Sequence, residues 1–324
     1  MFAVMTASML LLTACGEAGG NGDGGGSGLP GTLVGEGTGY IHTSVLRTGS
    51  DWLERLSISG GYDVVALNLP ANELYVAGLN FLDPMDVAVY DLATFGRKDE
   101  WLWPDTVDLG RVEGLAVSPD GRHAAALLWG LGRETFLEIL DLETREVVVS
   151  GFTGVSGGDM MWVSETGLLF AMDLEEQEPD FHGGIVVMDW ADMIAGGDRL
   201  DYSVLVGFDQ AQWDSGFGVH SFAMSADRTQ MVFSRAGDLW VKDLGSAEPP
   251  HQLTTGPTPS RGAAFSPDDS LIVFVEFHRY GLESTFVIPN HRDAPILIDS
   301  ATADGSHYLL NRNNLVERIL AWLP

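Results

Sequence analysis

The chain contains little cysteine and little positive charge. It has one Cys, and 17 Lys and Arg stand against 46 Asp and Glu, which gives a net charge of −29. A single Cys excludes an internal disulfide, and the lack of any Cys-x-x-Cys pair excludes thiolate zinc sites and iron–sulfur clusters. So acidic a chain is repelled by nucleic acid and by anionic membrane surfaces, and we expect neither as a partner. The 45% of hydrophobic residues nevertheless predicts a globular body with a sizeable core.

The N-terminal residues contain a candidate targeting signal. The apolar stretch Phe2–Leu12 is too short to span a bilayer, and it runs into Leu12-Thr13-Ala14-Cys15. This tetrad resembles the lipobox of bacterial lipoproteins. The resemblance implies a signal peptide over residues 1–14 and a lipid on the thiol of Cys15. Residues 15–32 are mostly glycine and predict a flexible tether.

From this resemblance we expect a lipoprotein of the bacterial cell envelope, in the outer membrane and facing the periplasm or the surface. The lipid would be its only contact with the membrane. The alternative is a buried first strand at Phe2–Leu12 with a buried thiol at Cys15.

From Tyr62 onward, two apolar strands around a polar turn recur along the chain. Three copies are clear and three are weaker: Val112–Trp129, Val219–Arg235 and Ser260–Phe277, then Tyr62–Gly78, Gly158–Asp173 and Leu297–Leu310. A third strand ending in Asp stands between copies, at Asp91, Asp141, Asp189 and Asp243. The turns begin 36 to 61 residues apart, and periods near the mid-forties indicate propeller blades. Consecutive apolar residues, as in Leu271–Phe277, predict strands buried on both faces.

The turns Ser118-Pro119-Asp120-Gly121 and Ser266-Pro267-Asp268, with the strand Asp238–Leu244, resemble the repeats of TolB-type, WD-like β-propellers. The resemblance implies an all-β fold, a single β-propeller over residues 33–324. Six blades of four antiparallel strands are expected, and seven blades are the alternative. Residues Gly39–Ser59 predict outer strands and the last repeat predicts inner ones, so the chain ends should share a blade and close the ring. Residues Leu315–Leu323 fit a short helix as well as a strand.

Aligning the repeats reveals a candidate ligand site. Five residues before each turn stands a charged or ionisable side chain in five of the six copies: Asp63, Glu113, Asp159, His220 and Arg261. The position opens the innermost strand, so these side chains should converge on one mouth of the central channel. The long loops between second and third strands lie at the same face, where function on a rigid scaffold is usually found. The structural alternative is a polar ring that only hydrates the channel.

Two other motifs have simpler interpretations. Ser156 lies in Gly154-Val155-Ser156-Gly157-Gly158, which matches a hydrolase nucleophile elbow, but the residues that follow predict a strand instead of the required helix. We therefore predict a glycine-rich connection and no nucleophile there. The acidic run Asp173–His182 could ligate Ca²⁺, but it lacks the residue order of a calcium loop and is typical of a solvated loop.

Two functions of different classes remain. The first is a monomeric, cofactor-free binding or scaffold propeller that engages an envelope protein, peptide or glycan through its loop face. The second is a metal-dependent hydrolase or lactonase propeller with a cation at the channel mouth. Three carboxylates suit a cation, whereas Arg261 opposes one. The binding function is favoured, and the sequence assigns neither a catalytic residue nor a metal.

Overall fold

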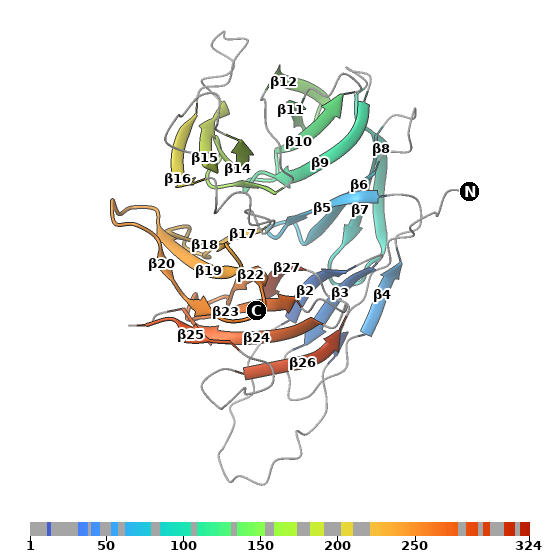
Figure 1. Cartoon of the computed structure of the whole chain (residues 1–324). Coiled ribbons are helices and arrows are strands. Elements are labelled where there is room, and N and C mark those ends of the chain that lie inside the picture. Colours follow the sequence, from blue (N-terminus) through green and yellow to red (C-terminus); the bar gives the residue numbers. More distant parts are fainter. Residues whose placement is uncertain are drawn as a thin grey trace, which may run out of the picture. The chain divides into compact units, whose positions relative to one another are not determined.

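The fold is built from β-sheets in two compact units (Figure 1). One unit contains residues 60–214 with the first four residues, and the other contains residues 5–59 and 215–324. The structure is a computed structural model, and it describes residues 12–13, 32–37, 40–45, 53–57, 62–78, 85–104, 109–130, 135–152, 159–173, 182–190, 202–209, 221–277, 283–290, 294–298, 308–314 and 318–324. Within these ranges, no helix has the length and apolar character needed to cross a membrane.

The described part of residues 60–214 forms three antiparallel sheets of four strands each. The first contains β5 (Tyr62–Asn68), β6 (Glu73–Gly78), β7 (Asp86–Asp91) and β8 (Arg97–Leu102). The second contains β9 (Leu109–Val117), β10 (His123–Gly130), β11 (Thr135–Asp141) and β12 (Glu146–Phe152). The third contains β13 (Met160–Trp162), β14 (Gly167–Asp173), β15 (Gly183–Asp189) and β16 (Ser203–Phe208). Spatial order follows chain order in each sheet, as the sequence repeat predicts.

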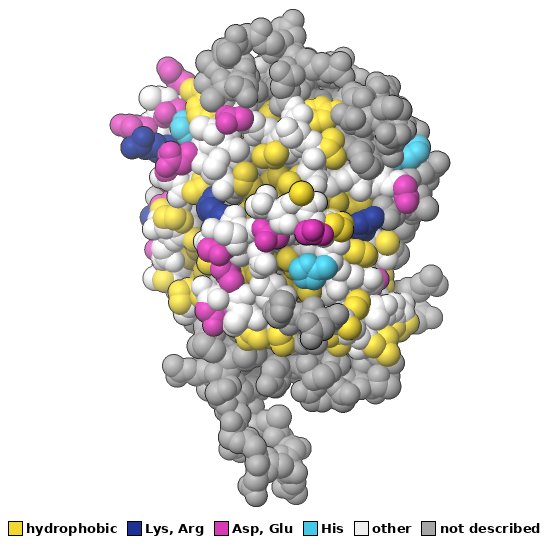
Figure 2. Space-filling view, turned by 90° about the vertical axis from the view of Figure 1, so that its left-hand side faces the viewer, with side chains coloured by type: hydrophobic (Ala, Val, Ile, Leu, Met, Phe, Trp, Pro, Cys, Tyr) yellow, Lys and Arg dark blue, Asp and Glu magenta, His cyan; other side chains and the backbone are white. Residues whose placement is uncertain are grey.

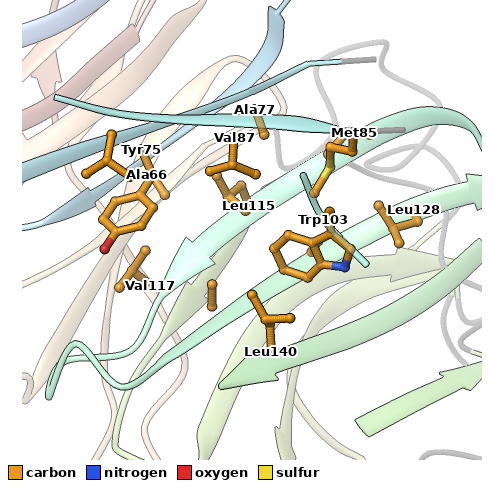
Figure 3. Close-up of a cluster of buried hydrophobic side chains, with 14 residues drawn as sticks. Ala66, Tyr75, Ala77, Met85, Val87, Trp103, Leu115, Val117, Leu128 and Leu140 are labelled. Carbon is orange, nitrogen blue, oxygen red and sulfur yellow. The ribbon is translucent and has the colours of Figure 1, made fainter. Parts of the chain in front are cut away.

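The consecutive apolar residues of the inner strands are explained by burial on both faces. In β10, Ala124, Ala126 and Leu128 pack in a cluster with the β5–β8 sheet (Figure 3). Ala125 and Leu127 point the other way, into a cluster with the β13–β16 sheet. Because side chains alternate along a strand, a strand between two sheets must be apolar at every position. The expectation of doubly buried strands is confirmed.

The second unit contains two further four-stranded sheets among its described residues. One consists of β17 (Phe222–Met224), β18 (Gln230–Arg235), β19 (Asp238–Asp243) and β20 (His251–Gln252). The other consists of β22 (Ser260–Phe265), β23 (Leu271–Phe277), β24 (Glu283–Pro289) and β26 (Tyr308–Asn314). A pair of short parallel strands, β21 (Thr254–Thr255) and β25 (Ile296–Leu297), lies beside them.

The predicted sixth repeat, Leu297–Leu310, is wrong. Residues Ile296–Leu297 form β25, and Tyr308–Asn314 form β26, the last strand of the sheet that begins with β22. The described residues 296–298 and 308–314 therefore supply no inner strands of a further sheet. The polar turn resembled the other repeats, but the pairing partners, which only the tertiary structure provides, differ.

Both ends of the chain do meet in one sheet. β27 (Arg318–Leu323) pairs with β2 (Thr32–Gly37), β2 pairs with β3 (Tyr40–Val45), and β3 pairs with β4 (Leu53–Ser57). The two-residue strand β1 (Leu12–Thr13) also pairs with β3, in parallel. Among the described residues of this sheet, the C-terminus thus contributes one strand where inner strands were expected, and the N-terminus contributes four, β1 to β4. Residues Arg318–Leu323 are a strand, which decides between the two alternatives left for this segment.

Three Ser-x-Asp turns share one hydrogen-bond pattern. The hydroxyls of Ser118, Ser225 and Ser266 donate to Asp120, Asp227 and Asp268, over 2.6, 2.7 and 2.7 Å. Each hydroxyl also accepts the backbone N–H five residues later, at 2.9 Å in all three turns. The Asp and Ser side chains thereby replace backbone partners that a short turn leaves open.

Candidate functional site

The first strands of the sheets in residues 60–214 lie next to one another. β9 lies against both β5 and β13. Asp63 is in β5, Glu113 is in β9, and Asp159 immediately precedes β13. The structure therefore brings the backbone positions of three predicted site residues to corresponding places on three neighbouring strands.

Asp63 and Glu113 are extra residues of β-bulges at equivalent positions. In β9, Val112 pairs with Leu128 and Gly114 with Leu127, so the chain takes up Glu113 as an additional residue. In β5, Tyr62 pairs with Gly78 and Val64 with Ala77, which leaves Asp63 in the same role. A bulge re-aims the side chain and increases the local twist, and bulges are frequent beside functional sites.

Because of the bulges, the directions of the Asp63 and Glu113 side chains no longer follow from the regular alternation of side chains along a strand. The sequence argument relied on a strand period of two, which holds only along an unbroken ladder. In β22 the irregularity comes later: Arg261 pairs with Val275, and the shift lies between Arg261 and Ala264. Arg261 therefore lies in regular pairing where Asp63 and Glu113 do not. The direction of each side chain is set by its own bulge and not by the repeat alone.

The described side chains of the site are Glu113, Asp159 and Arg261, and all three are half-buried. Oε1 of Glu113 and Oδ2 of Asp159 are buried atoms. Asp63 is described only in its backbone, and His220 and Cys15 lie outside the described residues. Asp63, Glu113 and Asp159 belong to one unit, and His220 and Arg261 belong to the other. The convergence of all five on one mouth therefore stays a prediction.

The other sequence motifs lie largely outside the described residues. Ser156 lies in the stretch 153–158, and most of the acidic run Asp173–His182 lies in 174–181. The described chain resumes after Ser156 at Asp159 and enters the strand β13, which is the element predicted there. Among the described side chains, no three or more His, Cys, Asp and Glu are grouped as metal ligands.

Asp238 is a functional candidate that sequence reasoning missed. It begins β19 after the tight turn at Ala236 and Gly237, whose φ angles are 53° and 86°. Burial raises the pKa of Asp238 to about 6, and Gln252 Nε2 donates a hydrogen bond to its Oδ2 over 2.9 Å. The available signal was an Asp placed directly before the apolar strand Leu239–Val241.

Comparison with known proteins identifies the fold. No family model and no curated protein matches the chain. Among solved structures, TolB from Acinetobacter baumannii is similar with a TM-score of 0.59 and 16% identity, over 91% of this chain and 67% of that one. The β-propeller domain of Cps50 (Swd1) from Myceliophteria thermophila has a TM-score of 0.50 and 14% identity, over 78% and 72%. A chain of a nidogen/laminin complex has a TM-score of 0.56 and 11% identity, over 89% and 99%.

The chain folds as a β-propeller. The all-β propeller predicted from the repeats is thereby confirmed, and each four-stranded sheet is a propeller blade. The identities are low, so the likeness concerns the fold and leaves function to be argued from the site.

Acidic side chains outnumber basic ones on one face of the molecule (Figure 2). On the face in Figure 2, Asp and Glu side chains are more frequent than Lys and Arg among the described residues. This agrees with the net charge of −29. A field of this sign attracts cations and basic segments and repels anions.

Proposed function

We propose that the protein is a lipid-anchored binding propeller of the bacterial cell envelope. Its partner is an envelope protein, peptide or glycan that it engages through its loop face. The observation that carries this proposal is the pair of equivalent bulges that place Asp63 and Glu113 at the same point of two neighbouring first strands. The partner group that suits such a mouth is cationic, because a half-buried carboxylate favours a nearby positive charge.

The fold relatives support a binding role. One similar chain was solved in a nidogen/laminin complex, so a chain of this fold occurs in an assembly with another protein. A propeller of six closed blades belongs to the same proposal, with the sheet of β27, β2, β3 and β4 as the closing blade. A monomer belongs to the same proposal, because ring closure pairs the N- and C-terminal strands with each other and leaves neither open to a second copy.

The proposed location in the cell envelope is based on Leu12-Thr13-Ala14-Cys15 and on the glycine-rich residues that follow. Expression in bacteria with radiolabelled palmitate should label the natural sequence and leave the Cys15→Ala variant unlabelled. Labelling of both proteins would contradict the anchor. The binding proposal would then stand on the propeller alone.

The mouth is tested by thermal unfolding with cationic probes. Spermine at about 0.15 M salt, where long-range surface attraction is largely screened, should raise the melting temperature of the wild type by mass action. The shift should be lost in Glu113→Gln/Asp159→Asn and retained in Glu165→Gln, which removes an exposed carboxylate of the same unit. An equal shift in all three proteins would show that spermine binds elsewhere. Stabilisation by Ca²⁺ or Mg²⁺ but not by spermine would favour the metal-dependent hydrolase instead.

A further inference from the structure

The connection between β24 and β26 contains a segment that lies on another sheet. β24 ends at Pro289 and β26 begins at Tyr308, although the two strands pair with each other. Antiparallel neighbours are usually joined by about two to five residues. Within this long connection, the structure describes residues 294–298, of which Ile296–Ile298 pair with the chain that follows β20 in the neighbouring blade (Figure 1). We call residues 294–298 the strap.

The strap extends the outer edge of the β17–β20 blade. Its register places Ile296 opposite Thr254 and Leu297 opposite Thr255, in parallel. Ile296 N–H donates to the Leu253 carbonyl over 2.9 Å, and Ile298 N–H donates to the Thr255 carbonyl over 2.7 Å. The blade's own fourth strand, β20, has only two residues. The strap pairs with Thr254–Thr255, which follow β20 in the chain after one residue.

The side chains of the strap alternate as in a bound peptide. Ile296 is 8% exposed, Leu297 is 60% exposed and Ile298 is fully buried. Strand addition to a sheet edge uses backbone hydrogen bonds for affinity and pockets for alternate side chains for specificity. Here the two backbone hydrogen bonds are formed and the alternate side chains, Ile296 and Ile298, are buried.

The edge is shaped for a close backbone approach at Gly256. A Cβ atom on Gly256 would lie 2.4 Å from the carbonyl oxygen of Ile298, far inside contact distance. Glycine is therefore required at this position as long as a strand occupies the edge.

We propose that this edge is a binding site for an extended peptide and that the strap is its internal occupant. The partner segment has branched aliphatic residues two positions apart and runs parallel to β21. It takes the places of Ile296 and Ile298 when the strap detaches. Parallel pairing is less stable per residue than antiparallel pairing, and the strap is not needed to join β24 to β26. The strap competes with the partner at a high effective concentration, so it acts as an autoinhibitory segment.

The test uses the full chain and a peptide with the sequence of residues 292–299. Ile296→Ser/Ile298→Ser weakens the strap and leaves the edge intact. A fluorescent peptide should bind this variant at least about tenfold more tightly than the wild type, in which the strap occupies the edge. A peptide with both isoleucines replaced by serine should not bind. Adding Gly256→Ala to the variant should abolish binding, because the new Cβ blocks the backbone approach.

Hydrogen exchange of the wild type provides a second, independent readout. The Ile296 and Ile298 amides should exchange through a local opening, faster than the Val287 and Ile288 amides of β24. Exchange of all four only at the rate of global unfolding would show that the strap does not detach and would overturn the proposal. Equal peptide affinity for the variant with and without Gly256→Ala would place the peptide elsewhere and would also overturn it.

Discussion

Left-handed backbone recurs at one residue of the Ser-x-Asp turns. Gly121, Arg228 and Asp269 occupy the same position, three residues after the serine, with φ angles of 69°, 58° and 58°. In each turn the N–H of this residue donates to the serine carbonyl. Glycine adopts this conformation without a steric cost, whereas other residues are strained there. The hydrogen bonds thus impose the left-handed conformation on this position. A residue other than glycine can occupy it, but its Cβ atom adds backbone strain.

Gly121→Ala is expected to lower the free energy of unfolding by about 1–2 kcal/mol. The alanine Cβ would be strained at positive φ and would also meet Nδ2 of Asn68 at 2.9 Å. Gly245→Ala is the matched control, because its Cβ meets only Asp243 Oδ1 at 3.6 Å, an ordinary contact. Urea unfolding of both variants measures the difference. Equal stability of the two would contradict the strain argument.

Asp238→Asn is expected to raise the melting temperature at pH 7.5 and to leave it nearly unchanged at pH 4. The folded pKa of Asp238 is about 6, raised by burial above the unfolded value of about 3.9. The folded state therefore holds this proton more tightly, and the resulting stabilisation is complete below about pH 4 and lost as pH rises through about 6. Asparagine stays neutral and avoids that loss.

Asp227→Asn is expected to change the melting temperature in the opposite direction from Asp238→Asn, because the pKa of Asp227 is lowered in the folded state. Hydrogen bonds from the Thr229 N–H and from the hydroxyls of Ser225 and Thr229 lower the pKa of Asp227. Its stabilisation is present above the unfolded pKa and is lost as pH falls through the folded pKa. This variant should therefore lower the melting temperature at pH 7.5, and the difference should shrink towards acid pH. The same pH trend in both variants would contradict the two assignments.

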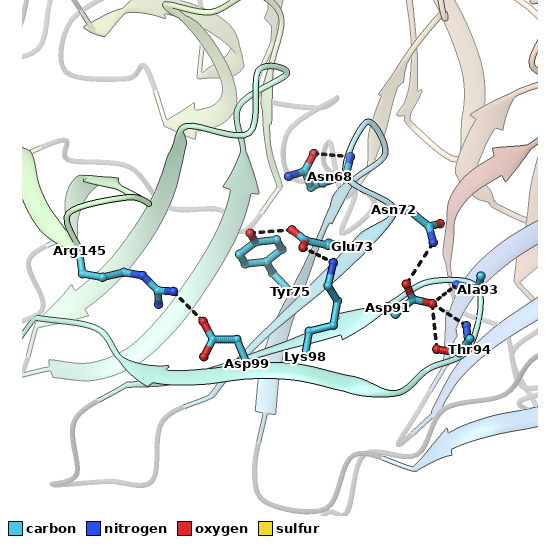
Figure 4. Close-up of polar contacts among 11 residues, drawn as sticks. Asn68, Asn72, Glu73, Tyr75, Asp91, Ala93, Thr94, Lys98, Asp99 and Arg145 are labelled. Atoms are coloured by element: carbon cyan, nitrogen blue, oxygen red, sulfur yellow. Dashed lines mark hydrogen bonds and ion pairs between the residues drawn. The ribbon is translucent and has the colours of Figure 1, made fainter.

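At the scale of elements, the β5–β8 and β9–β12 blades are joined by both buried and exposed polar contacts. In the interior, Trp103 Nε1 donates to Glu138 Oε2 over 2.8 Å, with both side chains almost fully buried. At the surface, Arg145 pairs with Asp99 over 2.7 Å (Figure 4) and stacks on the Trp101 ring at 4.4 Å. The exposed pair adds little stability, whereas the buried bond satisfies a carboxylate that water does not reach.

Trp103→Phe is expected to lower the free energy of unfolding by about 1–3 kcal/mol, because Glu138 loses a donor in the interior. Trp101→Phe is the control from the same stacked pair, whose rings lie 5.7 Å apart. Trp101 is half-buried, and its loss should cost about 0.5 kcal/mol. Thermal or urea unfolding distinguishes the variants. A control that is as destabilised as Trp103→Phe would mean that ring packing, and not the hydrogen bond, stabilises this junction.

At the scale of the whole molecule, stability depends on pairing between residues nearly the full chain length apart. The Arg318 guanidinium bonds Glu36 over 2.7 and 3.1 Å on the paired strands β27 and β2. Ile319 and Trp322 of β27 pack with Leu33 of β2 and with Val273 and Val275 of β23. The C-terminal strand therefore completes a core to which two blades contribute.

Removal of residues 318–324 is expected to abolish cooperative unfolding of the unit that contains them. Loss of the buried Ile319 and Trp322 side chains alone costs about 5–10 kcal/mol, comparable with the stability of a typical domain, and it also exposes the edge of β2. Removal of residues 1–11, which ends before β1, is the control and should leave the melting temperature unchanged. Circular dichroism during heating measures both. An unchanged transition in the C-terminal truncation would argue against closure by β27.

Local sequence patterns predict most of the strands, the polar turns and the propeller. The two-strand repeat and the consecutive apolar residues of strands such as β10 record local turn chemistry and burial on both faces, which are properties of neighbouring residues. The tertiary structure decided what depends on distant partners: the assignment of Leu297–Leu310, the division of the last sheet between the two chain ends, and the bulges at Asp63 and Glu113. A polar turn looks the same whichever strand it leads to, and a bulge exists only relative to the opposite strand. The pairing of the strap could not be predicted from the sequence either, because its partners Leu253 and Thr255 lie about forty residues before it.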